Sequence, residues 1–215
     1  MKRVMIMALS LVAALAMMVS IASAEGTGPK VTLRTAKGPL VKNQNLVAFS
    51  SNLVFSTSAG NLECSKNTIT GFAKTNTKEK PSGEITKEES TGEESGGLCK
   101  TTTPFGPASI EAQNLGWKIK FTNKGVVQIN SNKGDKTVTF VSTFPAAGGA
   151  KCAFASKKVL SSFPVSTTPV PLVITTSNQV FKLKAGSTAG CPTEGKLNGT
   201  FSTTSNGEPV EVEVK

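Results

Sequence analysis

The segment Gly116-Trp117-Lys118-Ile119-Lys120-Phe121 alternates large apolar side chains with lysines. Because neighbouring side chains of a β-strand point to opposite faces of a sheet, this alternation places Trp117, Ile119 and Phe121 on one face. Residues 123–125 form a turn signal, and residues 126–129 carry the chain back with Val, Val, Gln and Ile. The stretch therefore predicts a β-hairpin with one buried face.

The same two-residue alternation recurs along the chain, filled by Thr, Val and Phe, whereas helical periodicity is missing. Roughly eleven short strands separated by turn signals predict an all-β, antiparallel, sandwich-like or partly open barrel domain over 25–215. Two smaller β units divided near Pro104–Pro107 are an alternative. Besides the hairpin, we expect strands at 31–35, 52–57, 62–65, 67–75, 137–141, 151–156, 172–176, 180–184, 197–203 and 210–214, with a bulge at Gly71.

Residues 78–97 break the alternation. They contain six glutamates and a single large apolar residue, Ile85. Such a segment has little apolar surface with which to offset the entropy of ordering it. We therefore predict a mobile acidic loop over 78–97, held at its end by Cys99.

Residues 1–24 have the pattern of a secretory signal peptide. Lys2 and Arg3 precede an apolar run over 4–21, and Ala22-Ser23-Ala24 supplies the small residues of a cleavage site before Glu25. A retained transmembrane anchor is the alternative, because the run could nearly span a bilayer. Cleavage predicts a protein that is secreted or held on the exterior of the cell envelope, without a transmembrane anchor.

The four cysteines predict two disulfide bonds. An even number of cysteines in an exported chain that lacks histidine is typical of a disulfide framework, and no closely spaced cysteine pair favours a zinc site. Three connectivities are possible. We favour the pairing of neighbours along the sequence: Cys64 with Cys99, and Cys152 with Cys191.

Composition excludes several functional classes. Without histidine there is no Ser-His-Asp or Cys-His catalytic pair and no imidazole metal ligand. The net charge is +10, but nearly all of the basic residues are lysines, whereas nucleic-acid readers rely on arginine. We therefore expect no nucleic-acid partner. Anionic polymers of the cell envelope are possible partners, although scattered lysines are also typical of a soluble exported protein.

Acidic residues outside residues 78–97 and the chain ends are few. They are Glu63, Glu111, Asp135 and Glu194, and no spacing ties two of them into the pair of carboxylates that glycoside hydrolysis needs. Trp117 could stack on a sugar, but its register with Ile119 and Phe121 favours the core. We accordingly predict no catalytic residue, no metal ligand and no cofactor.

Two stretches resemble exported, Thr-rich proteins of actinobacterial type: Thr57-Ser58-Ala59-Gly60-Asn61-Leu62-Glu63-Cys64-Ser65 with Gly71, and residues 190–201. The resemblance implies bacterial export and an all-β fold, and it transfers neither an activity nor a site residue.

Three functional hypotheses follow. The first is a non-catalytic exported protein with a binding or structural role at the cell envelope. The second is an extracellular hydrolase that works through carboxylates alone, which the single Asp and the absence of His disfavour. The third is a small-molecule carrier, which requires an apolar cavity that Phe-rich strands could line; an enclosed pocket above about 300 Å3 would favour it, and a filled core would favour the first hypothesis.

Overall fold

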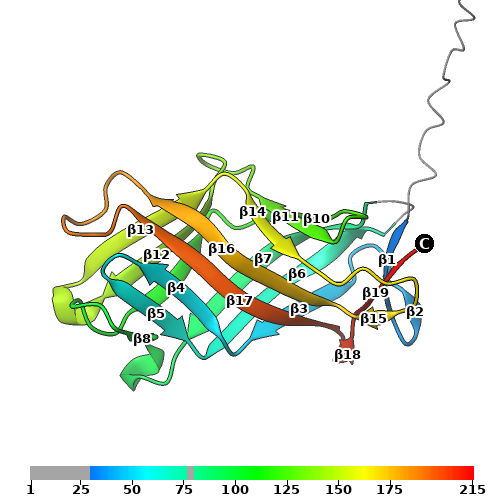
Figure 1. The fold of residues 1–215 in the computed structure, drawn as a ribbon, viewed down its shortest axis with the longest axis horizontal. Coiled ribbons are helices and arrows are strands. Elements are labelled where there is room, and N and C mark those ends of the chain that lie inside the picture. The colour runs from blue at the N-terminus through cyan, green and yellow to red at the C-terminus, as the bar shows by residue number, and fades with distance from the viewer. Residues whose placement is uncertain (1–29, 77–79) are drawn as a thin grey trace, which may run out of the picture.

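The computed structural model describes residues 30–76 and 80–215, so the predicted signal peptide over 1–24 lies outside the described residues. Antiparallel strands build an elongated body (Figure 1), with 62% of the described residues in strands and 3% in helix. In the described ranges the helical residues form two short 3-10 turns, Ser95–Gly97 and Pro145–Ala147. The all-β prediction is confirmed. No helix within the described ranges is long and apolar enough to cross a bilayer.

Eight strands close into an antiparallel barrel. The ring closes because β7 pairs with β10 as well as with β6. The sandwich-like or partly open form expected from the sequence is therefore refined to a closed barrel. In order around the ring, its strands are β10 (Trp117–Phe121), β11 (Val126–Asn130), β14 (Val159–Ser162), β16 (Val173–Leu183), β17 (Glu194–Ser205), β3 (Asn45–Ser50), β6 (Lys66–Thr75) and β7 (Ser82–Thr91).

The closing strand β7 corrects the prediction of a loop over 78–97. That prediction is wrong for residues 82–91, which pair with β6 on one side and β10 on the other. The glutamates do not prevent pairing because Glu84 and Glu89 form ion pairs with Lys74 and Lys87. A strand in the middle of a sheet satisfies its backbone on both sides, and this gain does not depend on side-chain polarity.

The predicted set of strands also needs correction elsewhere. The two strands predicted at 172–176 and 180–184 are parts of one long strand, β16 (Val173–Leu183), whose pairing with β17 shifts register between Thr176 and Gln179. Among the longer strands, the alternation also did not indicate β3, β14 and β9 (Ser109–Gln113). The hairpin of β10 and β11 is confirmed.

Beyond the barrel, β16 and β17 continue into a second group of strands, which we call the aromatic lobe. On one side β13 (Ala150–Ser156), β12 (Val138–Phe144) and β9 (Ser109–Gln113) extend from β16; on the other, β4 (Leu53–Thr57), β5 (Gly60–Cys64) and β8 (Lys100–Thr101) extend from β17. Five aromatic rings meet edge to face in this region: Phe55, Phe154, Phe181, Phe140 and Trp117.

A small sheet lies at the opposite end of the barrel (Figure 1). In this end sheet β19 (Glu211–Val214) lies between β15 (Val170–Pro171) and β1 (Val31–Thr35), and β2 (Gly38–Pro39) pairs with β1. The two-residue strand β18 (Glu208–Pro209) pairs with the end of β17. Buried Val31, Val210 and Val212 join the same apolar cluster as Phe121 and Leu172, so the sheet packs against the barrel core.

Strands from the two halves of the sequence are interleaved. The pairs β7–β10 and β3–β17 each join a strand before Pro104–Pro107 to one after it. A division of the chain into two β units at this point would break both pairs and open the barrel. The alternative of two independent units there is therefore wrong.

Candidate functional site

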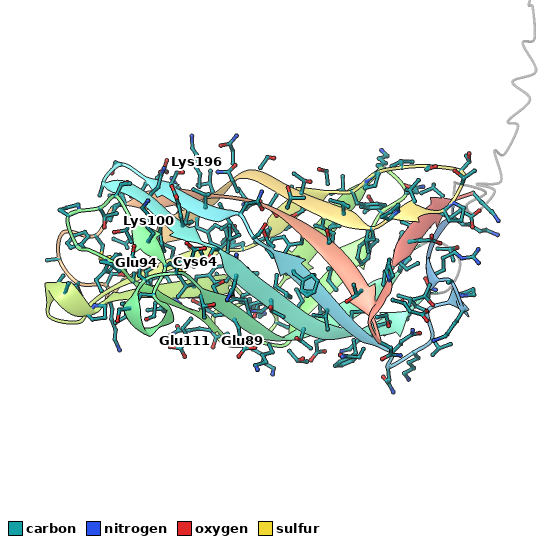
Figure 2. The ribbon with its side chains drawn as sticks, turned by 90° about the horizontal axis from the view of Figure 1, so that it is seen from below. Cys64, Glu89, Glu94, Lys100, Glu111 and Lys196 are labelled. Atoms are coloured by element: carbon teal, nitrogen blue, oxygen red, sulfur yellow. A yellow bond between two sulfur atoms is a disulfide. The ribbon has the colours of Figure 1, made fainter. Side chains whose placement is uncertain are left out.

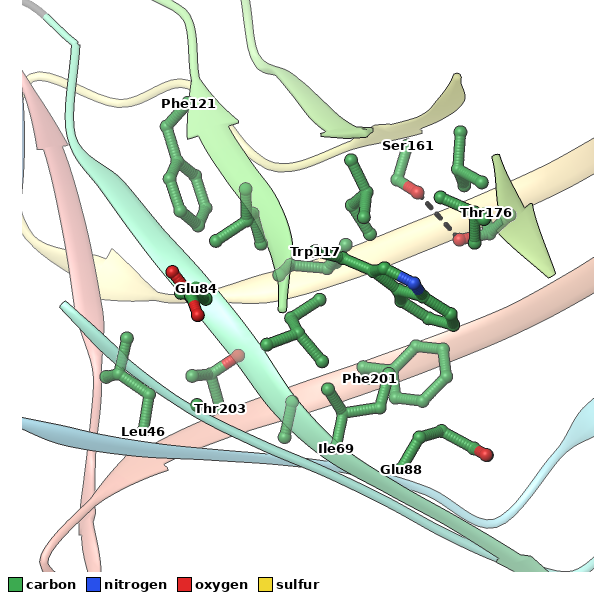
Figure 3. Close-up of a pocket in the computed structure, with 18 of the residues that line it drawn as sticks. Leu46, Ile69, Glu84, Glu88, Trp117, Phe121, Ser161, Thr176, Phe201 and Thr203 are labelled. Atoms are coloured by element: carbon green, nitrogen blue, oxygen red, sulfur yellow. Dashed lines mark hydrogen bonds between the residues drawn. The ribbon is translucent and has the colours of Figure 1, made fainter. Parts of the chain in front are cut away.

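The interior of the barrel contains a cavity of about 100 Å3 (Figure 3). Every barrel strand contributes to its wall, and nearly all of the lining side chains are apolar. It lies between the apolar cluster beneath the end sheet and the aromatic cluster of the lobe. The lining side chains include Leu46, Ala48, Ile69, Glu88, Trp117, Ile119, Phe121, Phe140, Ser161, Thr176, Phe201 and Thr203.

Aromatic pairs border the cavity toward both ends of the barrel. Trp117 packs edge to face on Phe140, with ring centres 5.3 Å apart, on the side of the aromatic lobe. Phe121 packs on Phe163 at 5.7 Å on the side of the end sheet. Since β10 alternates strictly, Trp117, Ile119 and Phe121 face this interior together, as its sequence predicted.

Trp117 is a core residue, as the sequence favoured. Its side chain is buried, and its Nε1 donates a hydrogen bond to the backbone oxygen of Gln113 at 3.2 Å. A sugar-stacking platform must present a ring face to solvent, and Trp117 presents none. Trp117 therefore forms part of the cavity wall.

A few polar groups interrupt the apolar wall. The hydroxyls of Ser161 on β14 and Thr176 on β16 share a hydrogen bond of 2.7 Å, drawn as a dashed line in Figure 3. The Oγ1 of Thr203 on β17 is buried and has no hydrogen-bond partner among the described residues. The wall is therefore mostly inert but carries isolated polar atoms.

Glu88 is the exceptional side chain of the wall. It lies on β7 directly opposite Ile69 of β6. Its Oε1 accepts a hydrogen bond from Ser90 Oγ, whereas its Oε2 is buried without a partner in the described part of the chain. Burial raises the pKa of Glu88 to about 7; the Ser90 hydrogen bond opposes this rise, and the charge of Glu89 adds to it.

A β-bulge turns Glu88 inward. Gly71 pairs with Ile85, but the next residue on β6, Thr70, pairs with Lys87, so β7 has one extra residue there. Strict alternation from buried Ile85 would place Lys87 inside and Glu88 outside. The bulge predicted at Gly71 is confirmed, but a predicted loop over 78–97 gives no indication of its effect on Glu88.

The acidic residues weighed for hydrolysis lie elsewhere. Glu63, Glu111, Asp135 and Glu194 do not line the cavity. Glu111 lies exposed at the edge of the molecule (Figure 2). Lys184 Nζ is 2.5 Å from Asp135 and its hydrogen bond lowers the pKa of that carboxyl to about 2; the hydrogen bond from Lys182 likewise lowers the pKa of Glu194. Each of these two carboxylates is thus bound to its own lysine.

Both predicted disulfide bonds are confirmed, and they have the favoured pairing. Cys64 at the end of β5 is bonded to Cys99, with 4.6 Å between their Cα atoms. Cys152 on β13 is bonded to Cys191, with a Cα separation of 5.7 Å. In the described ranges, no group of three or more His, Cys, Asp or Glu side chains is gathered to hold a metal ion.

The cavity suits a small apolar molecule. An apolar cavity of about 150 Å3 engineered into another protein binds benzene, whereas sites for drug-sized ligands measure about 300–1,000 Å3. The space inside this barrel belongs to the smaller class. Comparisons of the chain with protein-family models, curated proteins and solved structures give no match. Fold and site define a disulfide-bonded antiparallel barrel with an apolar interior cavity.

Proposed function

We propose that this chain is an exported, non-catalytic binding protein that holds a small apolar molecule inside its barrel. The observation that carries the proposal is the cavity of about 100 Å3, because natural cores of this kind are packed with few voids larger than a water molecule. Apolar lining favours transfer of an apolar ligand from water, and the cavity offers few polar groups that would lose hydration.

The sole tryptophan provides a direct assay, since Trp117 lines the cavity. Toluene titrated into the protein is expected to change Trp117 fluorescence saturably and to raise the melting temperature, because a ligand that binds only the folded state stabilises it. No saturable change and no stabilisation up to the solubility limit of toluene would contradict the proposal.

A cavity-filling variant locates the binding. Ala48 lines the cavity from β3, so Ala48→Leu should occupy part of the space and weaken toluene binding. Phe49→Leu is the matched control, because Phe49 is the next residue of the same strand and is 43% exposed. Equal binding by both variants would place the ligand elsewhere.

Binding to anionic envelope polymers is the second candidate function. It is favoured by the net charge of +10 and by the exposed lysines of β10, Lys118 and Lys120. Co-sedimentation with a polyanion such as teichoic acid tests it, with binding that weakens as salt rises. Absence of binding at low salt would exclude this role without affecting the cavity proposal.

A further inference from the structure

The cavity wall contains one ionisable side chain, half-buried Glu88, whose carboxylate is incompletely bonded. Two glutamates, 84 and 88, contribute to the wall, and no lysine or arginine does. Glu84 is engaged by Lys74 in an ion pair. Glu88 Oε2 has no partner in the described residues although it is buried. Thr203 Oγ1 is the other lining atom that is buried without a partner among the described residues, and it is uncharged, so Glu88 is the incompletely bonded group of the wall that can carry charge.

A carboxylate in this position is poorly solvated. Its neighbour across the sheet is Ile69, and Ser90 satisfies only one of its two oxygens. A buried carboxylate gains most from a donor that also carries positive charge, since charge-assisted hydrogen bonds are the stronger ones. Ile69, which pairs with Glu88, and Phe201 also line the cavity (Figure 3), so a donor that reaches Glu88 would have its apolar part in an apolar surrounding.

We propose that Glu88 makes the cavity selective for small amphipathic amines, with the ammonium group on the Glu88 carboxylate and the hydrocarbon against the apolar wall. This inference rests on the proposed binding function and assigns its ligand class. An acid of the same length would bring like charge to Glu88, and an alcohol would supply a donor without charge. Amines are therefore expected to bind most tightly.

The charged side chains near Glu88 do not neutralise its carboxylate inside the barrel. Glu89 follows it on β7 and faces outward, 2.8 Å from Lys87 Nζ. The charged side chains of the strands paired with β7 are exposed or half-buried: Lys66 and Lys74 on β6, Glu111 on β9, and Lys118 and Lys120 on β10. A cation inside the cavity thus meets no competing lysine from the lining.

The test compares four probes of similar size by Trp117 fluorescence: n-hexylamine, 1-hexanol, hexanoate and toluene. At pH 8 the wild-type protein should bind hexylamine at least about tenfold more tightly than hexanol, which corresponds to a hydrogen bond to a charged group. Hexylamine affinity should fall by up to about tenfold per pH unit below pH 7, as Glu88 takes up a proton. Toluene affinity should not change.

Two variants of equal size separate Glu88 from its neighbour. Glu88→Gln should remove the preference for hexylamine and its pH dependence, whereas Glu89→Gln should retain both. Should Glu88→Gln fail to fold, the pH profile of the wild type decides. Equal affinity for hexylamine and hexanol at pH 8, or a preference that survives in Glu88→Gln, would overturn the amine selectivity while toluene binding upholds the cavity. If no probe binds, both proposals are wrong.

Discussion

Glu88 of β7 lies directly opposite Ile69 of β6, so a carboxyl group shares the inner face of the barrel with the aliphatic core. Its Oε1 is hydrogen-bonded to Ser90, and its Oε2 is buried without a partner in the described residues. An ionised side chain in such a place destabilises the folded protein unless something binds it. The stability of the folded protein should therefore depend on the protonation of Glu88.

Glu88→Gln should flatten the pH dependence of stability. Burial raises the folded-state pKa of Glu88 from 4.5 to about 7, so the folded protein holds more protons than the unfolded chain between these values. Wild-type stability therefore falls as pH rises through this window, by about 2–3 kcal/mol from this group. Urea unfolding at pH 4.5, 6 and 8 measures it. Glu89→Gln serves as control, and parallel curves for wild type and Glu88→Gln would contradict the prediction.

Gly71→Ala should destabilise the barrel at the bulge. A Cβ on Gly71 would lie 2.2 Å from the backbone oxygen of Glu84, so the two strands would have to separate. We expect a loss of about 1–3 kcal/mol, as for other overpacked sites. Thr70→Ala on the same strand is the control because Thr70 pairs with outward-facing Lys87. Denaturant unfolding that shows equal stability for the two variants would mean that the bulge tolerates a side chain.

Trp117→Ala should cost about 3–5 kcal/mol, the range for truncating a large buried aromatic residue. Trp117 is 2% exposed and packs on Phe140. Because the variant loses the only tryptophan, its unfolding is followed by far-UV circular dichroism. Phe49→Ala is the control, and it should lower the free energy of unfolding much less because Phe49 is exposed. Similar losses for the two would show that Trp117 is not part of the packed interior.

The two disulfides should stabilise the fold unequally. They span 35 and 39 residues, so restriction of the unfolded chain predicts a similar contribution of about 3–4 kcal/mol from each. Cys64 and Cys99 are both buried, whereas Cys191 is only half-buried. Replacing Cys64 and Cys99 by Ala should therefore cost more than the same change at Cys152 and Cys191. Chemical denaturation of the two double variants compares them, and the reverse order would be incompatible with packing as the cause.

The secreted protein should have an intact mass that corresponds to a chain beginning at Glu25 with two disulfide bonds. Mass spectrometry under non-reducing conditions measures the start and the bonds together. Alkylation without reduction is the control and should add nothing. Four reactive thiols would contradict export into an oxidising compartment, and a mass that includes residues 1–24 would contradict cleavage of the signal peptide.

Where a strand has one buried face, local patterns in the sequence were sufficient to predict which of its side chains point inward. The alternation of β10 fixes which of its side chains point inward, and that orientation follows from the two-residue period of any β-strand. The cysteines are paired in their order along the chain, because closing the shorter loops between sequence neighbours loses the least chain entropy. Gly71 marked a bulge in the same local way.

Only the tertiary structure decided how the barrel closes and where Glu88 lies. The composition of β7 disfavours a strand, yet its backbone is bonded on both sides by β6 and β10, partners that no local pattern identifies. The extra residue opposite Gly71 then reverses the facing of every later side chain of β7. Sequence alone thus determined a disulfide-bonded, all-β chain. Long-range strand pairing determined the cavity and the position of Glu88 in its wall, because hydrogen bonding between distant backbone segments outweighs local side-chain preference.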